Sequence, residues 1–110
     1  MHEFGLCEGV LEAVRRRADG RPVRQVRLRV GVRHAAVPAS MEQAFQLLAE
    51  GTEAGGATLV LVTIPARLAC RGCGATADTD DLLAVCPSCG SDDVSLDGGD
   101  ELTLESLEYA

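Results

Sequence analysis

The sequence predicts an α+β fold: two helices on a three-stranded sheet, with a small cysteine module inserted before the last strand. Two stretches, 4–18 and 38–50, carry apolar residues at helical spacing. Three others, 26–32, 58–64 and 101–109, have the composition or alternation of strands. Two C-x-x-C pairs lie between the second and the third of these strands. The order helix, strand, helix, strand, module, strand makes this the simplest architecture.

The first helix is expected to begin almost at the start of the chain. Phe4, Cys7 and Leu11 share its apolar face, and Asp19-Gly20 ends it. We therefore expect the amino group, His2 and Glu3 to form a short arm ahead of the helix, which packing can position.

The next elements follow from alternation and from capping signals. Stretch 26–32 alternates Val or Leu with Arg, so it predicts a strand with one apolar and one basic face. Ser40 to Gln43 has the form of a capping box for the second helix, although Pro38 can equally open it. Stretch 58–64 is apolar on both faces and is therefore expected to be the central strand.

The cysteine module has the spacing of a metal site. Cys70 and Cys73 form one pair, Cys86 and Cys89 the other, with twelve residues between the pairs and a glycine after each pair. A glycine there permits the positive φ that turns amide N–H groups toward sulfur. Four converging thiolates form the closed tetrahedral arrangement of structural zinc, with a rubredoxin-like iron site as the alternative. The module is thus zinc-ribbon-like. The fifth cysteine, Cys7, is expected to be a small core residue.

Length, composition and charge limit the class of protein. The 110 residues suggest one domain with an appendage, which we place at 1–66 plus 97–110 for the larger domain and 67–96 for the zinc-binding module. No apolar run approaches the roughly 18 residues of a membrane span, and we see no signal peptide, so we expect a cytoplasmic protein. Residues 67–110 hold two Arg and ten Asp or Glu, a net charge of −8, which disfavours nucleic acid as a partner.

The first three residues, Met1-His2-Glu3, carry a second kind of metal chemistry. The α-amine, the amide nitrogen of His2 and its imidazole can close two small chelate rings on one ion. A deprotonated amide favours a square-planar ion, so Ni(II) or Cu(II) suits this set better than Zn(II). All three nitrogens must lose protons, so we expect weak binding below about pH 6, where an ordinary imidazole is mostly protonated. His34 is a candidate fourth or transient ligand, with an exposed loop histidine as the alternative.

These features together resemble the hydrogenase maturation nickel-insertion proteins, the HypA family. The likeness rests on the Met1-His2-Glu3 start, a Val-rich strand ending at Gly31, the C-x2-C-x12-C-x2-C module and the closing strand 101–108. It implies a nickel metallochaperone for NiFe hydrogenase that binds nickel through His2 and backbone nitrogens, with Glu3 supporting the site, and structural zinc through the four cysteines. The implied partners are a nickel-binding maturation GTPase and the hydrogenase large subunit. Some relatives have a carboxylate near the nickel after the first strand, whereas stretch 32–37 has none.

Two other classes of protein compete with this interpretation. One is a zinc-ribbon adaptor that binds other proteins and delivers no nickel. The other is a thiol oxidoreductase that uses the C-x-x-C pairs. No nucleophile–base pair, phosphate-binding loop or paired acids point to an enzyme.

Overall fold

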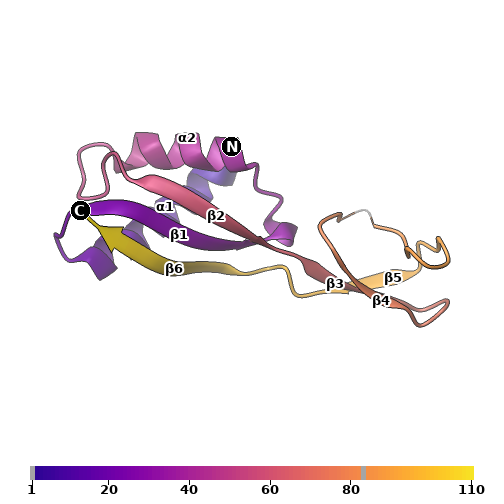
Figure 1. Ribbon diagram of the computed structural model, residues 1–110. Helices are drawn as coiled ribbons and strands as arrows, with labels where there is room; N and C mark the ends of the chain where they lie inside the picture. The colour runs from indigo at the N-terminus through magenta and orange to yellow at the C-terminus, as the bar shows by residue number, and fades with distance from the viewer. Residues whose placement is uncertain (1, 83) are drawn as a thin grey trace. The chain divides into compact units, whose positions relative to one another are not determined.

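The computed structural model describes residues 2–82 and 84–110 (Figure 1). Its elements, in chain order, are α1 His2–Ala18, β1 Val23–Gly31, a 3₁₀ turn Val32–His34, α2 Pro38–Ala49, β2 Thr58–Ile64, β3 Ala66–Cys70, β4 Thr76–Thr79, β5 Val94–Asp97 and β6 Leu102–Tyr109. The strands form two three-stranded sheets, β2-β1-β6 and β4-β3-β5. The predicted α+β class, with two helices, a three-stranded sheet and an inserted module of zinc-ribbon type, is confirmed. None of the described helices is long and apolar enough to cross a membrane.

The chain divides into two compact units. The first comprises residues 1–29, 36–62 and 103–110, and the second comprises 30–35 and 63–102. The first unit therefore contains both helices and most of the sheet β2-β1-β6, and the second contains the sheet β4-β3-β5 with all four module cysteines.

The core of the first unit lies between the helix pair and one face of its sheet. Val26 and Leu28 of β1 are buried there with Phe45 and Met41 of α2 and Val14 of α1. β1 is the middle strand, so the prediction that 58–64 is central is wrong. Strand β1 can be central despite its arginines because the outer face of the sheet accommodates charged side chains. Arg residues of β1 form ion pairs with Glu residues of β6 across that face, joining Arg24 to Glu108, and Arg27 and Arg29 to Glu105.

Helix α1 begins at His2, so the expected separate arm is wrong as well. The carboxylate of Glu3 accepts the backbone N–H of Val37 at 3.1 Å, which fixes the first turn of α1 against the start of α2. The helix ends as predicted, because Asp19 and Gly20 adopt positive φ angles of 49° and 84°. Helix α2 begins at Pro38 with no side-chain cap, so proline rather than the capping box opens it.

The second unit is organised around its middle strand, β3. Strand β3 pairs antiparallel with β4 and with β5, placing Leu68 opposite Ala77 on one side and Leu96 on the other. Leu68 is almost completely buried, and the other buried apolar side chains described in this unit are those of Val30, Ala66, Cys70 and Cys86. A core this small offers little hydrophobic stabilisation, so metal binding is expected to supply much of the folding free energy.

Gly31 ends β1 at a point where a side chain has no room. Its N–H donates to Glu101 O at 2.7 Å, and the N–H of Arg33 donates to Gly99 O at 2.7 Å. A Cβ atom on Gly31 would lie 2.0 Å from Gly99 O, which is far inside van der Waals contact. The two backbones can approach this closely only because position 31 is glycine. This contact explains why residues 30–35 belong to the second unit.

Candidate metal sites

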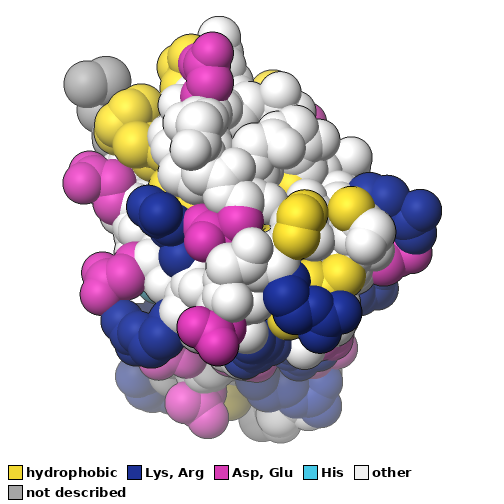
Figure 2. All heavy atoms as spheres, turned by 90° about the vertical axis from the view of Figure 1, so that its left-hand side faces the viewer, with side chains coloured by type: hydrophobic (Ala, Val, Ile, Leu, Met, Phe, Trp, Pro, Cys, Tyr) yellow, Lys and Arg dark blue, Asp and Glu magenta, His cyan; other side chains and the backbone are white. Residues whose placement is uncertain are grey.

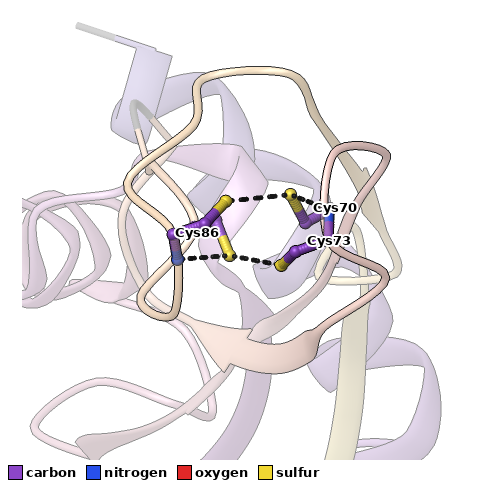
Figure 3. Close-up of side chains that lie close together, drawn as sticks. Cys70, Cys73 and Cys86 are labelled. Carbon is purple, nitrogen blue, oxygen red and sulfur yellow. Dashed lines mark hydrogen bonds between the residues drawn. The ribbon is translucent and has the colours of Figure 1, made fainter.

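Four cysteine sulfurs converge between two loops of the second unit. Figure 3 shows Cys70 and Cys73 on one loop facing Cys86 on the other. The Sγ atoms of Cys70 and Cys89 are 3.7 Å apart and those of Cys73 and Cys86 are 3.5 Å apart. All four ligand atoms lie within 4.8 Å of one another. The structure thus brings together the four residues predicted as zinc ligands.

The sulfur separations fit a tetrahedral zinc site. Four sulfurs at about 2.3 Å from one ion stand about 3.8 Å apart at the corners of a regular tetrahedron. The observed separations of 3.5 and 3.7 Å are close to that edge, and far longer than the roughly 2.05 Å of a disulfide. Among the described residues, this is the only group of three or more potential metal-ligating side chains that converges in this way.

The two loops repeat one backbone pattern. The N–H of Cys70 donates to Ala75 O at 2.9 Å, and the N–H of Cys86 donates to Ser91 O at 2.8 Å. Each second cysteine turns its N–H toward the sulfur of the first, at 3.5 Å in both loops. The glycines that follow, at positions 74 and 90, have φ angles of 79° and 77°, as the sequence predicted. Both knuckles are therefore shaped to present sulfur.

These amide groups also change the acidity of a thiol. The N–H of Cys89, against the opposing effect of burial and with a smaller contribution from the N–H of Ser88, lowers the pKa of Cys86 to about 6. An N–H that points at sulfur stabilises the thiolate, which is the form that binds metal. The backbone of this knuckle therefore favours the thiolate at Cys86.

The N-terminal candidates lie at the start of α1 in the first unit. Met1, predicted as the source of the α-amine, lies outside the described residues. The His2 side chain is 54% exposed, and its Nδ1 atom lies 3.5 Å from Oε1 of Glu3. Glu3 is the one buried charged residue described, at 6% exposure. The N–H of Val37, helped by Glu3's own amide and by His2, lowers the pKa of the Glu3 carboxyl to about 2. Glu3 is thus a fixed carboxylate beside an exposed imidazole.

His34 belongs to the second unit, at the end of the 3₁₀ turn. Its Nε2 atom lies 2.9 Å from the backbone oxygen of Asp100 within the same unit. A role for His34 in nickel binding stays a prediction.

Cys7 lies in the core of the first unit. Its side chain is fully buried, and its thiol contacts the carbonyl oxygen of Met41 at 3.3 Å. Burial, with a smaller effect from the charge of Glu3, raises the pKa of Cys7 to about 11. A neutral buried thiol is a packing group, so this geometry agrees with the expected core role.

One face of the structure carries charged side chains of both signs. In Figure 2, which views the molecule from the left of Figure 1, basic and acidic side chains are interspersed. Several of them form ion pairs, including Arg15 with Glu53 and Arg16 with Glu12. A phosphate backbone is bound by a continuous basic surface, and this view shows none.

Comparison with known proteins shows which family the chain belongs to. The family described as "Hydrogenase/urease nickel incorporation, metallochaperone, hypA" matches residues 1–109. The chain belongs to the HypA family. Among curated HypA relatives, the hydrogenase maturation factor of Alkalilimnicola ehrlichii is 39% identical over 112 residues, and that of Rhodobacter capsulatus is 34% identical over 111. Both alignments cover 98% of this chain and 98% of the relative.

Solved HypA structures share the fold. The solution structure of the Ni metallochaperone HypA from Helicobacter pylori aligns with a TM-score of 0.63 at 24% identity, covering 97% of this chain and 96% of that one. A second HypA solution structure aligns with a TM-score of 0.60 at 25% identity, covering 100% and 97%. The resemblance seen in the sequence is therefore confirmed at the level of family and fold.

Sequence reasoning missed one contact that shapes the N-terminal candidate. The main chain of Val37 holds the Glu3 carboxylate, although 34 residues separate them. No local pattern signals this contact, because any residue other than proline offers the same N–H. It could be found only once the packing of α1 against α2 was known.

Proposed function

We propose that this chain is a nickel metallochaperone that delivers Ni(II) during the maturation of NiFe hydrogenase. Nickel is carried by the N-terminal Met1, His2 and Glu3, and structural zinc is held by the four module cysteines. The observation that carries the proposal is the pair of unlike candidate sites within a HypA-family chain. One is a converged set of four sulfurs. The other is an exposed histidine at position 2, beside a fixed carboxylate.

The helical start of α1 is compatible with amide binding to nickel. The first four N–H groups of an α-helix have no partner within the helix, and the N–H of His2 is the first of α1. Removing the proton from the His2 amide therefore costs the helix none of its own hydrogen bonds. The amide nitrogen, the α-amine and the imidazole can then occupy three corners of a square-planar Ni(II) site.

Glu3 supports this site in the proposal. Its carboxylate lies next to the His2 ring and is held by the N–H of Val37. A carboxylate beside a metal-bound imidazole orients the ring and raises its basicity. Nickel binding by nitrogens from one exposed chain end also permits stepwise exchange, because an acceptor can replace the donors one at a time.

The proposed zinc has a different task. Cys70, Cys73, Cys86 and Cys89 would hold it, and four thiolates leave no open position for substrate. The ion would stabilise the second unit, whose own apolar core is small. The function is thus binding and transfer of an ion. The proposed partners are a nickel-binding maturation GTPase and the hydrogenase large subunit. The large subunit would accept the nickel ion.

Nickel titration of zinc-loaded protein with its native terminus tests the proposal. His2→Ala should weaken Ni(II) binding by more than the roughly 10- to 100-fold that the loss of a supporting residue costs. His34→Ala is the matched variant, since it removes the other histidine of the chain. An unchanged nickel affinity and spectrum in His34→Ala would eliminate that residue as a ligand. Unchanged affinity in His2→Ala would contradict the N-terminal site and leave the zinc-ribbon adaptor as the better interpretation.

A further inference from the structure

The four module cysteines differ in exposure. Cys70 and Cys86, the first of each pair, are buried at 5% and 1% exposure, whereas Cys73 and Cys89, the second of each pair, are exposed. A reagent in solution therefore meets the second cysteine of each pair first. Sulfur that binds a metal does so as the thiolate, which is also the form that oxidants attack. The module thus offers two accessible positions for oxidation and protects the other two.

The sulfur–sulfur contacts join one exposed cysteine to a buried cysteine of the other loop. The Sγ atoms of Cys73 and Cys86 lie 3.5 Å apart, a contact that Figure 3 draws as a dashed line between the loops. Those of Cys89 and Cys70 lie 3.7 Å apart. Within each loop, by contrast, the sulfur of the first cysteine accepts the N–H of the second, at 3.5 Å in both loops. An exposed sulfur that has been oxidised therefore touches a buried sulfur of the opposite loop.

We infer that the module is a site of reversible oxidation, in which a small neutral peroxide joins Cys73 to Cys86 and Cys70 to Cys89. The inference rests on the proposed zinc site, because metal binding keeps the four sulfurs as thiolates. It differs from that proposal in assigning the same four residues a second, metal-free form. Each disulfide removes two thiolates from the site, so the oxidised module no longer holds the ion.

The chemistry balances with hydrogen peroxide as the oxidant. The thiolate of an exposed cysteine attacks one oxygen and breaks the O–O bond, which gives a sulfenic acid and a hydroxide ion. The buried thiolate in contact with it then attacks the sulfenic sulfur, forms the disulfide and releases a second hydroxide ion. Two electrons pass from the two sulfurs to the peroxide. One peroxide is thus consumed for each disulfide.

The charge of the chain around the module favours a neutral oxidant. Residues 67–110 have a net charge of −8, and the exposed Asp92 and Asp93 closely follow Cys89 in the chain. A surface of this sign repels an anionic oxidant such as glutathione disulfide, whereas hydrogen peroxide carries no charge. Peroxide is also small enough to reach a partly covered sulfur. These two properties define the class of oxidant.

The inferred disulfides would replace the metal as the link between the two loops. They join residues separated by 13 and 19 positions in the chain, and a disulfide across such a loop restricts the unfolded chain. A disulfide within one C-x-x-C pair closes a single turn and leaves the two loops unconnected. The oxidised module is therefore expected to stay folded without zinc and to recover zinc binding on reduction.

Zinc release and disulfide mapping test the inference on the zinc-loaded full chain. Hydrogen peroxide is added in steps, and the zinc set free is measured with the dye 4-(2-pyridylazo)resorcinol. Two equivalents of peroxide per chain should release the zinc, because each of the two disulfides consumes one. Remaining thiols are then blocked. The chain is cut with trypsin after Arg67 and Arg71 and with Asp-N protease before Asp78, Asp81 and Asp92.

This digestion separates the possible pairings by mass. It places Cys70 and Cys73 on separate small peptides and keeps Cys86 with Cys89 on the peptide 81–91. The inferred bonds should link both small peptides to 81–91 in one three-part species. Bonds within each C-x-x-C pair would instead link the small peptides to each other. Fragmentation between the two cysteines of 81–91 should then assign Cys73 to Cys86.

Three controls separate this pairing from general oxidation. Cys7→Ala removes the fifth cysteine and should give the same zinc release and the same bonds. Two-dimensional NMR of the oxidised, zinc-free chain should keep the dispersed signals of 63–102, which the reduced, zinc-free chain loses. Dithiothreitol with added zinc should restore the original spectrum. Glutathione disulfide at the same concentration as peroxide should release zinc more slowly.

Each outcome decides the inference. Bonds within the C-x-x-C pairs, collapse of 63–102 on oxidation, or zinc that stays bound in excess peroxide would overturn it and leave the proposed zinc site intact. Faster release by glutathione disulfide than by peroxide would overturn the class of oxidant. A chain that takes up no zinc would overturn the proposed zinc site and the inference with it. Nickel titration of the zinc-loaded chain reports separately on the proposed nickel function.

Discussion

The four-cysteine site and the N-terminal site differ in how far the fold prepares them. The four sulfurs converge from two loops of matching backbone pattern, and amide groups already favour a thiolate at Cys86. At the N-terminus a backbone N–H holds the carboxylate of Glu3, and the side chain of His2 is 54% exposed. A prepared, closed site suits a resident ion, whereas a partly prepared, open one suits an ion that must be released. The contrast is the physical basis for proposing zinc at the first site and nickel at the second.

The largest effect is expected from breaking the prepared site. Cys86→Ser should abolish stoichiometric zinc binding and unfold the second unit, because structural zinc supplies on the order of 10 kcal/mol in zinc-finger peptides. Two-dimensional NMR should show the amide signals of 63–102 collapsing toward random-coil positions. Ser88→Ala, in the same knuckle, is the matched control and should keep both zinc and signals. A well-ordered second unit in metal-free Cys86→Ser would refute the structural role of the metal.

The next effect is expected at the open site. One glycine added before Met1 should remove most Ni(II) affinity, because the amine no longer lies one peptide unit from His2. Zinc content should not change, since the added residue belongs to the other unit. Isothermal titration with nickel, beside zinc analysis of the same sample, measures both. Full nickel affinity in the extended protein would show that the amine is not a ligand.

Acid should weaken nickel binding at a higher pH than it weakens the contact between Glu3 and Val37. Nickel affinity should fall as the pH is lowered, because protons compete with the ion for its nitrogen ligands. The Glu3 contact should persist further. A carboxyl whose pKa is lowered from 4.5 to about 2 stabilises the fold above pH 4.5 and loses that contribution as the pH falls toward 2. The difference in Tm between wild type and Glu3→Gln should therefore be constant at higher pH and shrink between pH 4.5 and 2. A difference that grows in acid would contradict the assigned role of Glu3.

At neutral pH, Glu3→Gln should lower nickel affinity by about 10- to 100-fold, the usual cost of losing a supporting group, while His2 still binds. Glu42→Gln, which alters an exposed acid of α2, is the matched control and should have no effect. Equal affinities for wild type and Glu3→Gln would remove Glu3 from the site.

The smallest effect is expected at Cys7. In the zinc-loaded protein this thiol should not react with iodoacetamide at pH 8, because it is buried and its pKa is raised to about 11. Cys7→Ala should keep both metals. Mass spectrometry after alkylation gives the number of modified cysteines. The unfolded, metal-free chain is the reference and should be modified at all five. Rapid modification of Cys7 in the folded protein would contradict its core role.

The features of the fold and of the candidate sites that the sequence predicted correctly are those determined by residues close together in the chain. The spacing of the four cysteines and the glycines at 74 and 90 indicated a metal knuckle correctly, because each loop contains its own geometry. Stretch 58–64 was predicted to be central because it is apolar on both faces, but β1 is the central strand, and its arginines form ion pairs with glutamates of β6. The helical start at His2 was missed for a similar reason, since Val37 holds Glu3 from a distant part of the chain.

The central claim is that nickel is bound by the N-terminal nitrogens and kept apart from the cysteine sulfurs. Nickel K-edge X-ray absorption on protein loaded with one zinc and one nickel tests it most directly. The account predicts a nickel shell of nitrogen and oxygen only, with the zinc edge of the same sample showing four sulfurs. Sulfur around nickel, unchanged when His2 is replaced by alanine, would contradict it.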